Sequence, residues 1–111
     1  PLREFVHSDD LADAILFIMQ NIDADNIYSR GISHLNIGSG EEIKIKDLAF
    51  LIKEITNFKG DIIFDNSKPD GTPRKLLDTS LINKFGWASK ISLEKGLKST
   101  YLWYINNHQA F

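Results

Sequence analysis

The spacing of apolar side chains changes within one stretch of the sequence, Ile43-Lys44-Ile45-Lys46-Asp47-Leu48-Ala49-Phe50-Leu51-Ile52-Lys53-Glu54-Ile55 (residues 43–55). At its start, Ile43 and Ile45 alternate with lysines, which is the period of a short strand or an edge segment. From Asp47 onward the apolar residues recur every three or four positions, which predicts an amphipathic helix whose apolar face is formed by Leu48, Leu51, Ile52 and Ile55. A stretch that combines both periods indicates a domain in which strands and helices are interleaved.

The segments on either side of this stretch continue the same mixture. Apolar and β-branched residues predict short strands or extended segments at 4–7, 34–37 and 61–64, and a short extended return at Leu76 and Leu77. The polar segment 23–33, which contains Gly31, is predicted to be a loop.

Three further helices are predicted from their caps and apolar stripes. Ser8 or Asp9 is expected to cap the first, whose core-facing stripe comprises Leu11, Ile15, Ile18, Met19 and Ile22. Asp78 is expected to cap a short helix that Gly86 ends. Ser92 caps a last helix, in which one face comprises Leu93, Leu97, Tyr101, Tyr104 and Ile105.

The predicted fold class is therefore α/β (α+β): one small domain, residues 1–111, with short strands interleaved with about four helices. The hydrophobic content of 42% and charged content of 25% are typical of a soluble globular domain. The net charge of -2 gives no basic field for nucleic acid, and the longest apolar run, residues 14–19, is too short to span a bilayer. The absence of cysteine excludes a disulfide framework and a thiolate metal site.

A charged loop follows the segment 61–64: Asp65-Asn66-Ser67-Lys68-Pro69-Asp70-Gly71-Thr72-Pro73-Arg74-Lys75. Its two prolines fix φ and stiffen the loop, and its cations are Lys68, Arg74 and Lys75. Together with the carboxylate of Asp70, these cations could hold a phosphate and a ribose or sugar hydroxyl. The alternative is an ordinary solvated connection between two packed segments. Arg3 offers the same choice between a surface position and a bidentate phosphate contact.

The sequence shows no complete catalytic constellation. Gly38-Ser39-Gly40 lacks the third glycine of a dinucleotide fingerprint, so a tight turn is expected there. The three histidines do not stand at a zinc-ligand spacing. Neither a Gly-x-Ser-x-Gly elbow nor a Tyr-x-x-x-Lys pair is present.

Several segments together resemble the extended short-chain dehydrogenase/reductases that act on nucleotide sugars. The resemblance rests on Arg3-Glu4-Phe5 followed by His7, Asp9, Asp10 and Ala12, on residues 34–40, and on Phe85-Gly86-Trp87 with residues 91–97. The most specific match is Ser67 to Asp78. It resembles the epimerase/reductases that convert GDP-4-keto-6-deoxy-D-mannose to GDP-L-fucose.

The resemblance implies that this chain is the C-terminal, nucleotide-sugar-binding part of a longer enzyme. An N-terminal Rossmann domain, absent from this chain, would bind NADP(H) and carry the catalytic residues. The chain alone would be inactive, and the parent would be a cytoplasmic, NADPH-dependent enzyme and a homodimer, with no nucleic-acid or membrane partner.

The resemblance also gives roles to the charged residues. Arg3 would bind the GDP diphosphate, Lys68 would face phosphate, and Asp70 would accept a hydrogen bond from a ribose hydroxyl. Arg74 and Lys75 are weaker candidates, because they could anchor the loop instead. The alternatives are another nucleotide-sugar epimerase or reductase of the same family and a non-catalytic nucleotide-sugar-binding or interaction module.

Overall fold

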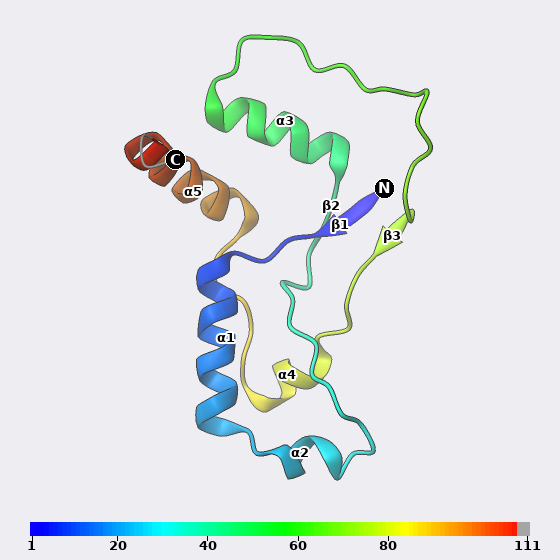
Figure 1. The fold of residues 1–111 in the computed structure, drawn as a ribbon, viewed down its shortest axis with the longest axis vertical. Helices are drawn as coiled ribbons and strands as arrows, with labels where there is room; N and C mark the ends of the chain where they lie inside the picture. Colours follow the sequence, from blue (N-terminus) through cyan, green and yellow to red (C-terminus); the bar gives the residue numbers. More distant parts are fainter. Residues whose placement is uncertain (109–111) are drawn as a thin grey trace.

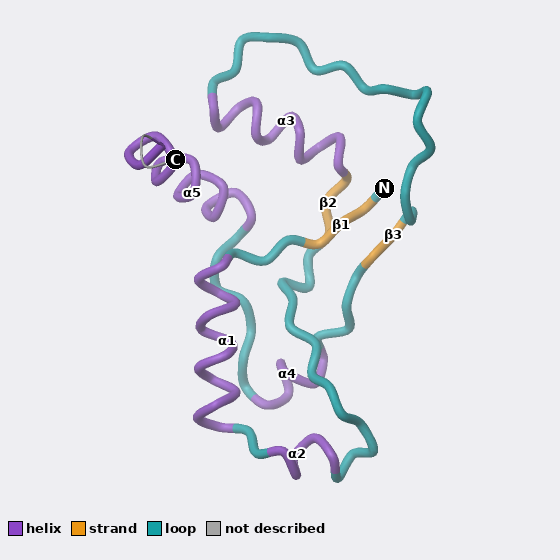
Figure 2. Tube along the Cα trace, viewed as in Figure 1, coloured by secondary structure: helices purple, strands orange, loops and turns teal. Residues whose placement is uncertain are grey.

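The computed structural model describes residues 1–108 and contains one small sheet with helices on either side of it (Figures 1 and 2). The strands are β1 (Leu2–Glu4), β2 (Glu42–Lys44) and β3 (Arg74–Lys75), in the order β2-β1-β3. Strand β1 is antiparallel to β2 and parallel to β3. The middle strand therefore brings the start of the chain between two segments that are distant in sequence.

Five helices are found among the described residues: α1 (Ser8–Asn21), α2 (Ala24–Tyr28), α3 (Ile45–Thr56), α4 (Ser80–Phe85) and α5 (Leu93–Asn107). The mixture confirms the predicted α/β class. Helix α5 begins where its cap predicts it, and α4 ends at Gly86 as predicted. The N-cap of α4 is Thr79 and not Asp78, whose carboxylate instead accepts from the Ser80 amide at 2.9 Å. Gly86 ends α4 with a φ of 114°, and the Ser92 hydroxyl accepts a hydrogen bond from the Lys95 amide at 3.3 Å.

Three other predicted boundaries are wrong. Helix α1 is capped by His7, whose Nδ1 accepts from the Asp9 amide at 3.0 Å, and not by Ser8 or Asp9. Helix α3 begins at Ile45, two residues before Asp47. The first strand lies at Leu2–Glu4 and not at 4–7.

Three of the predicted segments also differ in kind. Segments 34–37 and 61–64 are not strands, and neither pairs with the three-stranded sheet. Strand-like composition alone does not form a strand without a paired neighbour. The predicted loop 23–33 contains α2, since the Asn26 side chain accepts from the Asp23 amide at 2.7 Å and stabilises a helical turn.

The buried core lies between α1, α4 and the segment that follows α4. Its centre is Ala14, Ile82 and Trp87, against which four partly buried side chains pack: Phe17, Ile18, Leu35 and Ile37. The predicted apolar stripe of α1 is mostly not part of this core, since Ile15 is 47% exposed and Met19 is 76% exposed. The core-facing side of α1 is instead its Asp10–Ala14 side.

Two carboxylates on that side of α1 hold the segment after Trp87. Asp10, which is 2% exposed, accepts from the Lys90 amide at 3.1 Å and from the Ile91 amide at 2.9 Å. Asp13 accepts from the Trp87 indole and from the Lys90 ammonium, each at 2.9 Å. These contacts attach the chain between α4 and α5 to the first helix.

We expect the Asp13 contacts to make stability depend on pH. Hydrogen bonds from Lys90 and Trp87 hold the pKa of Asp13 below its ordinary value of 3.8. The folded-state pKa is depressed, so the stabilisation is present above the unfolded-state pKa and is lost as pH falls through the folded-state pKa. Urea unfolding should show Asp13→Asn less stable than the wild type at neutral pH, with the two converging below about pH 4. A difference that stays constant into acid would contradict this.

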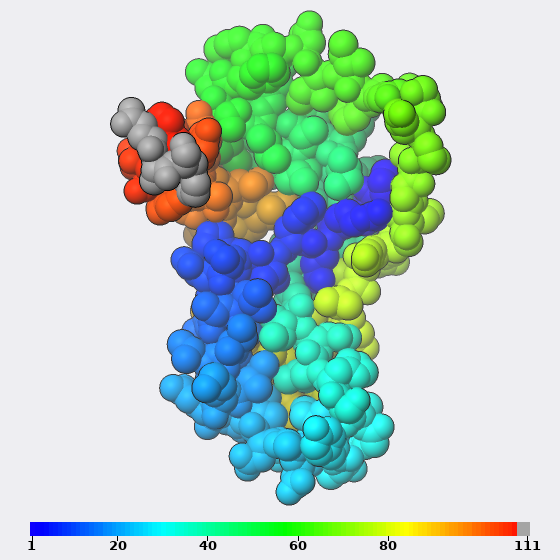
Figure 3. All heavy atoms as spheres, in the orientation of Figure 1, coloured from blue at the N-terminus to red at the C-terminus, as the bar shows by residue number. Residues whose placement is uncertain are grey.

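The chain is extended for its size. Its principal extents are 53 × 36 × 22 Å, and its radius of gyration is 17.4 Å against about 13 Å for a compact domain of this length. Its accessible surface is 8432 Å², whereas a monomer of this mass exposes about 6,200 Å². Figure 3 shows the part around α3 and α5 above the part around α1 and α2. This chain therefore leaves more of its surface exposed to solvent than a compact domain of the same mass does.

Apolar side chains contribute to this exposed surface. They include Leu11, Ile15, Leu16 and Met19 on α1, and Leu102, Trp103, Tyr104 and Ile105 on α5. None of the helices in residues 1–108 is long and apolar enough to cross a membrane.

Candidate functional site

The middle strand presents two neighbouring charged residues to opposite faces of the sheet. In the register, Arg3 is opposite Ile43 and Lys75, while Glu4 is opposite Glu42. Because side chains alternate along a strand, Arg3 and Lys75 share one face, and Glu4 and Glu42 share the other. The cations Arg3 and Lys75 are therefore on the opposite face of the sheet from the carboxylates Glu4 and Glu42.

Arg3 contacts the charged loop through main-chain oxygens. Its Nη1 donates to the carbonyl of Leu2 at 2.7 Å and to that of Thr72 at 2.6 Å. A side chain at Gly71 would begin 3.1 Å from Nη2, so the glycine permits this close approach. Of the five N–H donors of a guanidinium, the three on Nε and Nη2 have no hydrogen-bond partner within residues 1–108. The group is thus attached to the loop through Nη1, whereas Nε and Nη2 keep their hydrogen-bonding capacity, with Nη2 close to Gly71.

Lys68 and Asp70 lie in the exposed part of the same loop. Within the part of the chain that the structure describes, their side chains make no hydrogen bond or ion pair. Nearby, the Asp65 carboxylate accepts from the Ser67 hydroxyl at 2.5 Å and from its amide at 2.8 Å, and these bonds lower the pKa of Asp65. The loop therefore has its own turn structure but leaves one cation and one carboxylate facing solvent.

Arg74 and Lys75, adjacent in the loop, have different surroundings. Arg74 forms an ion pair with Glu42, which raises the pKa of Arg74, and its Nε lies 2.8 and 3.0 Å from the two carboxylate oxygens. Lys75 is exposed and lies beside Arg3 in the sheet. The structure thus brings Arg3, Lys75 and the 71–72 main chain together. Lys68 and Asp70 lie in the part of the loop that precedes residue 71. Arg74 is directed to the other face.

On that other face, Glu4 holds the glycine turn. Its Oε2 accepts from the Gly40 amide at 2.7 Å. A Cβ at Gly38 would lie 2.6 Å from Oε1, and Gly40 has a φ of 77°. Residues 38–40 therefore form the tight turn that the sequence predicts, because both glycines are required by backbone geometry and close approach.

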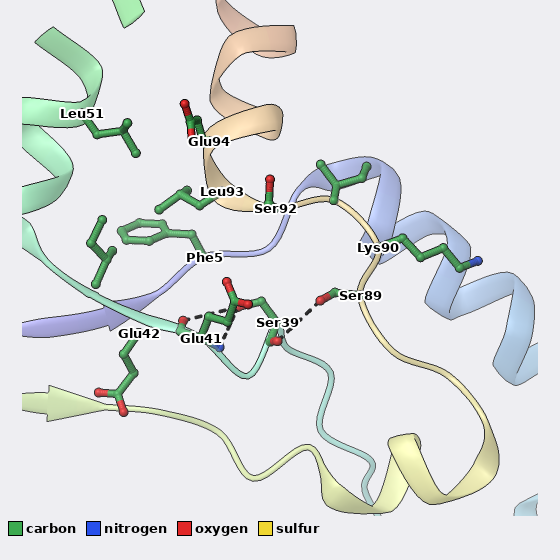
Figure 4. Close-up of a pocket in the computed structure, with 12 residues that line it drawn as sticks. Phe5, Ser39, Glu41, Glu42, Leu51, Ser89, Lys90, Ser92, Leu93 and Glu94 are labelled. Atoms are coloured by element: carbon green, nitrogen blue, oxygen red, sulfur yellow. Dashed lines mark hydrogen bonds between the residues drawn. The ribbon is translucent and has the colours of Figure 1, made fainter. Parts of the chain in front are cut away.

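A cavity of about 470 Å³ lies between β2 and the start of α5 (Figure 4). The Phe5 ring, Leu51 and Leu93 point into it, and the Ser89 hydroxyl donates to the Ser39 carbonyl at 3.4 Å beside it. Three of its lining residues are acidic, Glu41, Glu42 and Glu94, whereas only Lys90 is basic. This balance disfavours a phosphate there, so the open guanidinium of Arg3 is the better anion site. No cluster of residues able to hold a metal ion is found in residues 1–108.

Comparison with known proteins identifies the relatives of this chain. No model of a protein family matches it. It is 51% identical over 107 residues to GDP-L-fucose synthase 1 of Arabidopsis thaliana, covering 96% of this chain and 31% of the relative. It is 44% identical over 114 residues to GDP-L-fucose synthase of Escherichia coli K12, covering all of this chain and 35% of the relative.

The chain matches the C-terminal part of the GDP-L-fucose synthase family. It spans about a third of the length of the curated relatives. A solved structure, a GDP-mannoheptose C4 reductase from Campylobacter jejuni with NADP bound, has a TM-score of 0.80 and 43% identity over 94% of this chain and 32% of its own. The arrangement of strands and helices described above is therefore that of the C-terminal region of extended short-chain dehydrogenase/reductases.

Sequence reasoning missed two residues that hold this site in place, Glu4 and Glu42. Glu4 belongs to the segment that carries the family resemblance, but the sequence gives it no role, and no pattern distinguishes Glu42 from Glu41. A usable signal was present, since each is a charged residue next to an apolar one in a short strand. Their partners, the Gly40 amide and Arg74, are 36 and 32 positions away, so only the register reveals them.

Proposed function

We propose that this chain is the substrate-binding part of a GDP-L-fucose synthase. The parent enzyme would convert GDP-4-keto-6-deoxy-D-mannose to GDP-L-fucose by 3,5-epimerisation and NADPH-dependent 4-reduction. The observation that carries the proposal is the match to relatives of that name along nearly the whole chain. The open guanidinium of Arg3, beside a loop that carries Lys68, supplies a matching anion site.

The remaining parts of such an enzyme would lie outside this chain. Residues 1–111 contain no glycine-rich turn that opens a helix, so they do not fit an NADP(H) site. We assign NADP(H), which supplies the hydride for reduction, and the catalytic residues to an N-terminal Rossmann domain. The exposed apolar side chains and the extended shape support a missing domain that covers part of this surface. We expect the parent to be a cytoplasmic homodimer and this chain alone to be inactive.

The geometry suggests how the chain would bind the substrate. The Nε and Nη2 donors of Arg3 would form bidentate bonds to the diphosphate. Lys68 would add a charge on the phosphate side, and Asp70 would accept from a ribose hydroxyl. Lys75 is placed to assist Arg3, whereas Arg74 is engaged by Glu42 and would act as an anchor. Holding the sugar in a fixed orientation toward the nicotinamide would contribute to the rate.

Assay of the parent enzyme tests this function. The parent protein is incubated with NADPH and GDP-4-keto-6-deoxy-D-mannose, and the loss of NADPH absorbance and formation of GDP-L-fucose are followed. We expect turnover by the parent and none by residues 1–111 alone. If a folded parent protein that binds NADPH forms no GDP-L-fucose, the proposal is refuted.

A second candidate is reduction of a GDP-4-keto-heptose. It is favoured by the C. jejuni reductase, which resembles this chain about as closely as the E. coli synthase does. The same assay with a GDP-4-keto-heptose separates the two. The better substrate is the one with the higher kcat/KM, because that ratio compares transition-state binding of the two sugars.

Replacing Arg3 should weaken binding of the GDP-sugar to the parent. We expect Arg3→Ala to lose a charge-assisted contact worth about 2 kcal/mol, which is roughly a 30-fold increase in Kd for GDP. Arg3→Lys keeps the charge but not the bidentate geometry, so its loss should be intermediate. Titration calorimetry with GDP measures both, and an unchanged Kd for Arg3→Ala would refute the assignment.

A further inference from the structure

The loop between α3 and β3 is attached to the rest of the molecule mainly at its end. Figure 1 shows it leaving α3 and returning to the sheet along a wide path. Phe64 contacts the Phe50 ring edge-on at 6.1 Å between centroids. The next attachments are the Thr72 and Pro73 carbonyls, which accept from Arg3 and from the Leu2 amide. Within residues 1–108, Lys68 and Asp70 therefore lie in a span that is held at its two ends.

At this end β3 also pairs with β1 through the backbone, and Arg74 forms an ion pair with Glu42. Glu42 is on β2 and Arg74 on β3, so the ion pair bridges across the middle strand. Both carboxylate oxygens of Glu42 are engaged, and its side chain is only 13% exposed. A bidentate guanidinium–carboxylate contact of this kind fixes orientation as well as distance. The ion pair thus adds a side-chain restraint from β2 to the backbone pairing of β1 with β3, where the loop meets the sheet.

The environment of Glu42 explains why this pairing is specific. Glu42 is directly opposite Glu4 in the register. Two carboxylates in opposed positions repel each other unless each has its own partner. Glu4 is occupied by the Gly40 amide, and Arg74 is the cation that Glu42 contacts. Removing Arg74 would leave Glu42 facing Glu4 without a counter-charge.

We propose that Glu42 is a positioning residue for GDP-sugar binding, acting through Arg74 to hold the loop that carries Lys68 beside Arg3. The proposal rests on the proposed function. Without the ion pair, the end of the loop would be held by the backbone pairing of β1 with β3 and by the Arg3–Thr72 hydrogen bond, but the restraint from β2 would be lost, so more of the loop's order would have to be gained on binding. Glu42 itself contacts no substrate in this arrangement. Its loss should therefore weaken binding of substrate and transition state alike, which raises KM and leaves kcat unchanged.

The experiment compares Glu42→Ala, Arg74→Ala and the double variant in the parent enzyme. We expect each single variant to raise the KM for the GDP-sugar and the Kd for GDP by about tenfold, the factor for ordering one or two side chains on binding. Because the two residues act as one unit, the double variant should be no worse than either single variant. The matched control is Glu41→Gln, which removes a neighbouring charge that does not contact Arg74.

The outcomes separate this proposal from the proposed function. If the wild-type parent binds GDP and Glu42→Ala binds it with the same Kd, the positioning role of Glu42 is wrong, but the proposed function is unaffected. Additive losses in the double variant, or a fall in kcat that matches the rise in KM, also overturn it, because they indicate independent contacts or a general loss of structure. A wild-type parent that binds no GDP overturns both proposals.

Discussion

Replacing Trp87 by alanine is expected to cause the largest loss of stability, about 4 kcal/mol, because the change removes a whole buried indole and leaves a cavity. Trp87 is 3% exposed and lies in the core with Ala14 and Ile82. Its Nε1 also donates to Asp13 at 2.9 Å, so the variant loses an attachment to α1 as well as packing. Urea unfolding of residues 1–111 measures the change in free energy.

The matched control for this prediction is the other tryptophan. Trp103 is 53% exposed on α5, so Trp103→Ala should cost much less. Trp87→Phe keeps a ring but loses the indole donor and should fall between the two. Equal losses in Trp87→Ala and Trp103→Ala would show that the core is not where the structure places it.

Asp10→Ala should destabilise the fold by about 3 kcal/mol, because two amides that the carboxylate satisfies would be left without partners in a buried position. Those amides belong to Lys90 and Ile91, 80 and 81 positions away in the sequence. Asp10→Asn retains one oxygen acceptor and should lose about half as much. The urea midpoint of each variant gives the comparison.

Asp9 is a control at the adjacent position. It is also acidic and lies in the first turn of α1, but it is exposed. Asp9→Ala should cost only the few tenths of a kcal/mol that a charge contributes at a helix N-terminus. If the two alanine variants were equally unstable, the Asp10 effect would have to come from the helix dipole and not from its amide contacts.

The sequence predicts the helices better than the strands, and the reason is physical. Helices α3, α4 and α5 are specified locally, by apolar spacing and by caps such as Ser92 and Gly86. A strand depends on a neighbour, which local spacing does not reveal. Segments 34–37 and 61–64 have strand-like composition, but neither of them pairs with the sheet of β1, β2 and β3.

The orientation of α1 shows a second limit of pattern reasoning. The spacing of Leu11, Ile15 and Met19 identifies an apolar face, but it does not say what covers that face. In this chain the core is on another side of the helix, and the apolar stripe is largely exposed. The buried side instead carries Asp10, a residue type that a hydrophobic pattern never selects for burial.

For the candidate site, the sequence predicts the residue types and the structure supplies their pairing. The chemistry of Arg3, Lys68 and Asp70 can be read from the loop and from the resemblance, and their roles stay predictions. The separation of Arg74 from Lys75 could not be read in this way. It follows from a register in which neighbouring residues face opposite sides of the sheet.

That same register makes the start of the chain sensitive to insertions and deletions. Arg3 reaches the 71–72 main chain from one face, and Glu4 reaches the 38–40 turn from the other. Adding or deleting a single residue between β1 and α1 that shifted the strand by one position would exchange their faces, and both segments would lose their partners together. Exchanging the two residues, so that glutamate precedes arginine, would also place each side chain on the wrong face, without altering composition or charge. The contacts of β1 therefore depend on the order of Arg3 and Glu4. Single substitutions at either position would not detect this dependence on order.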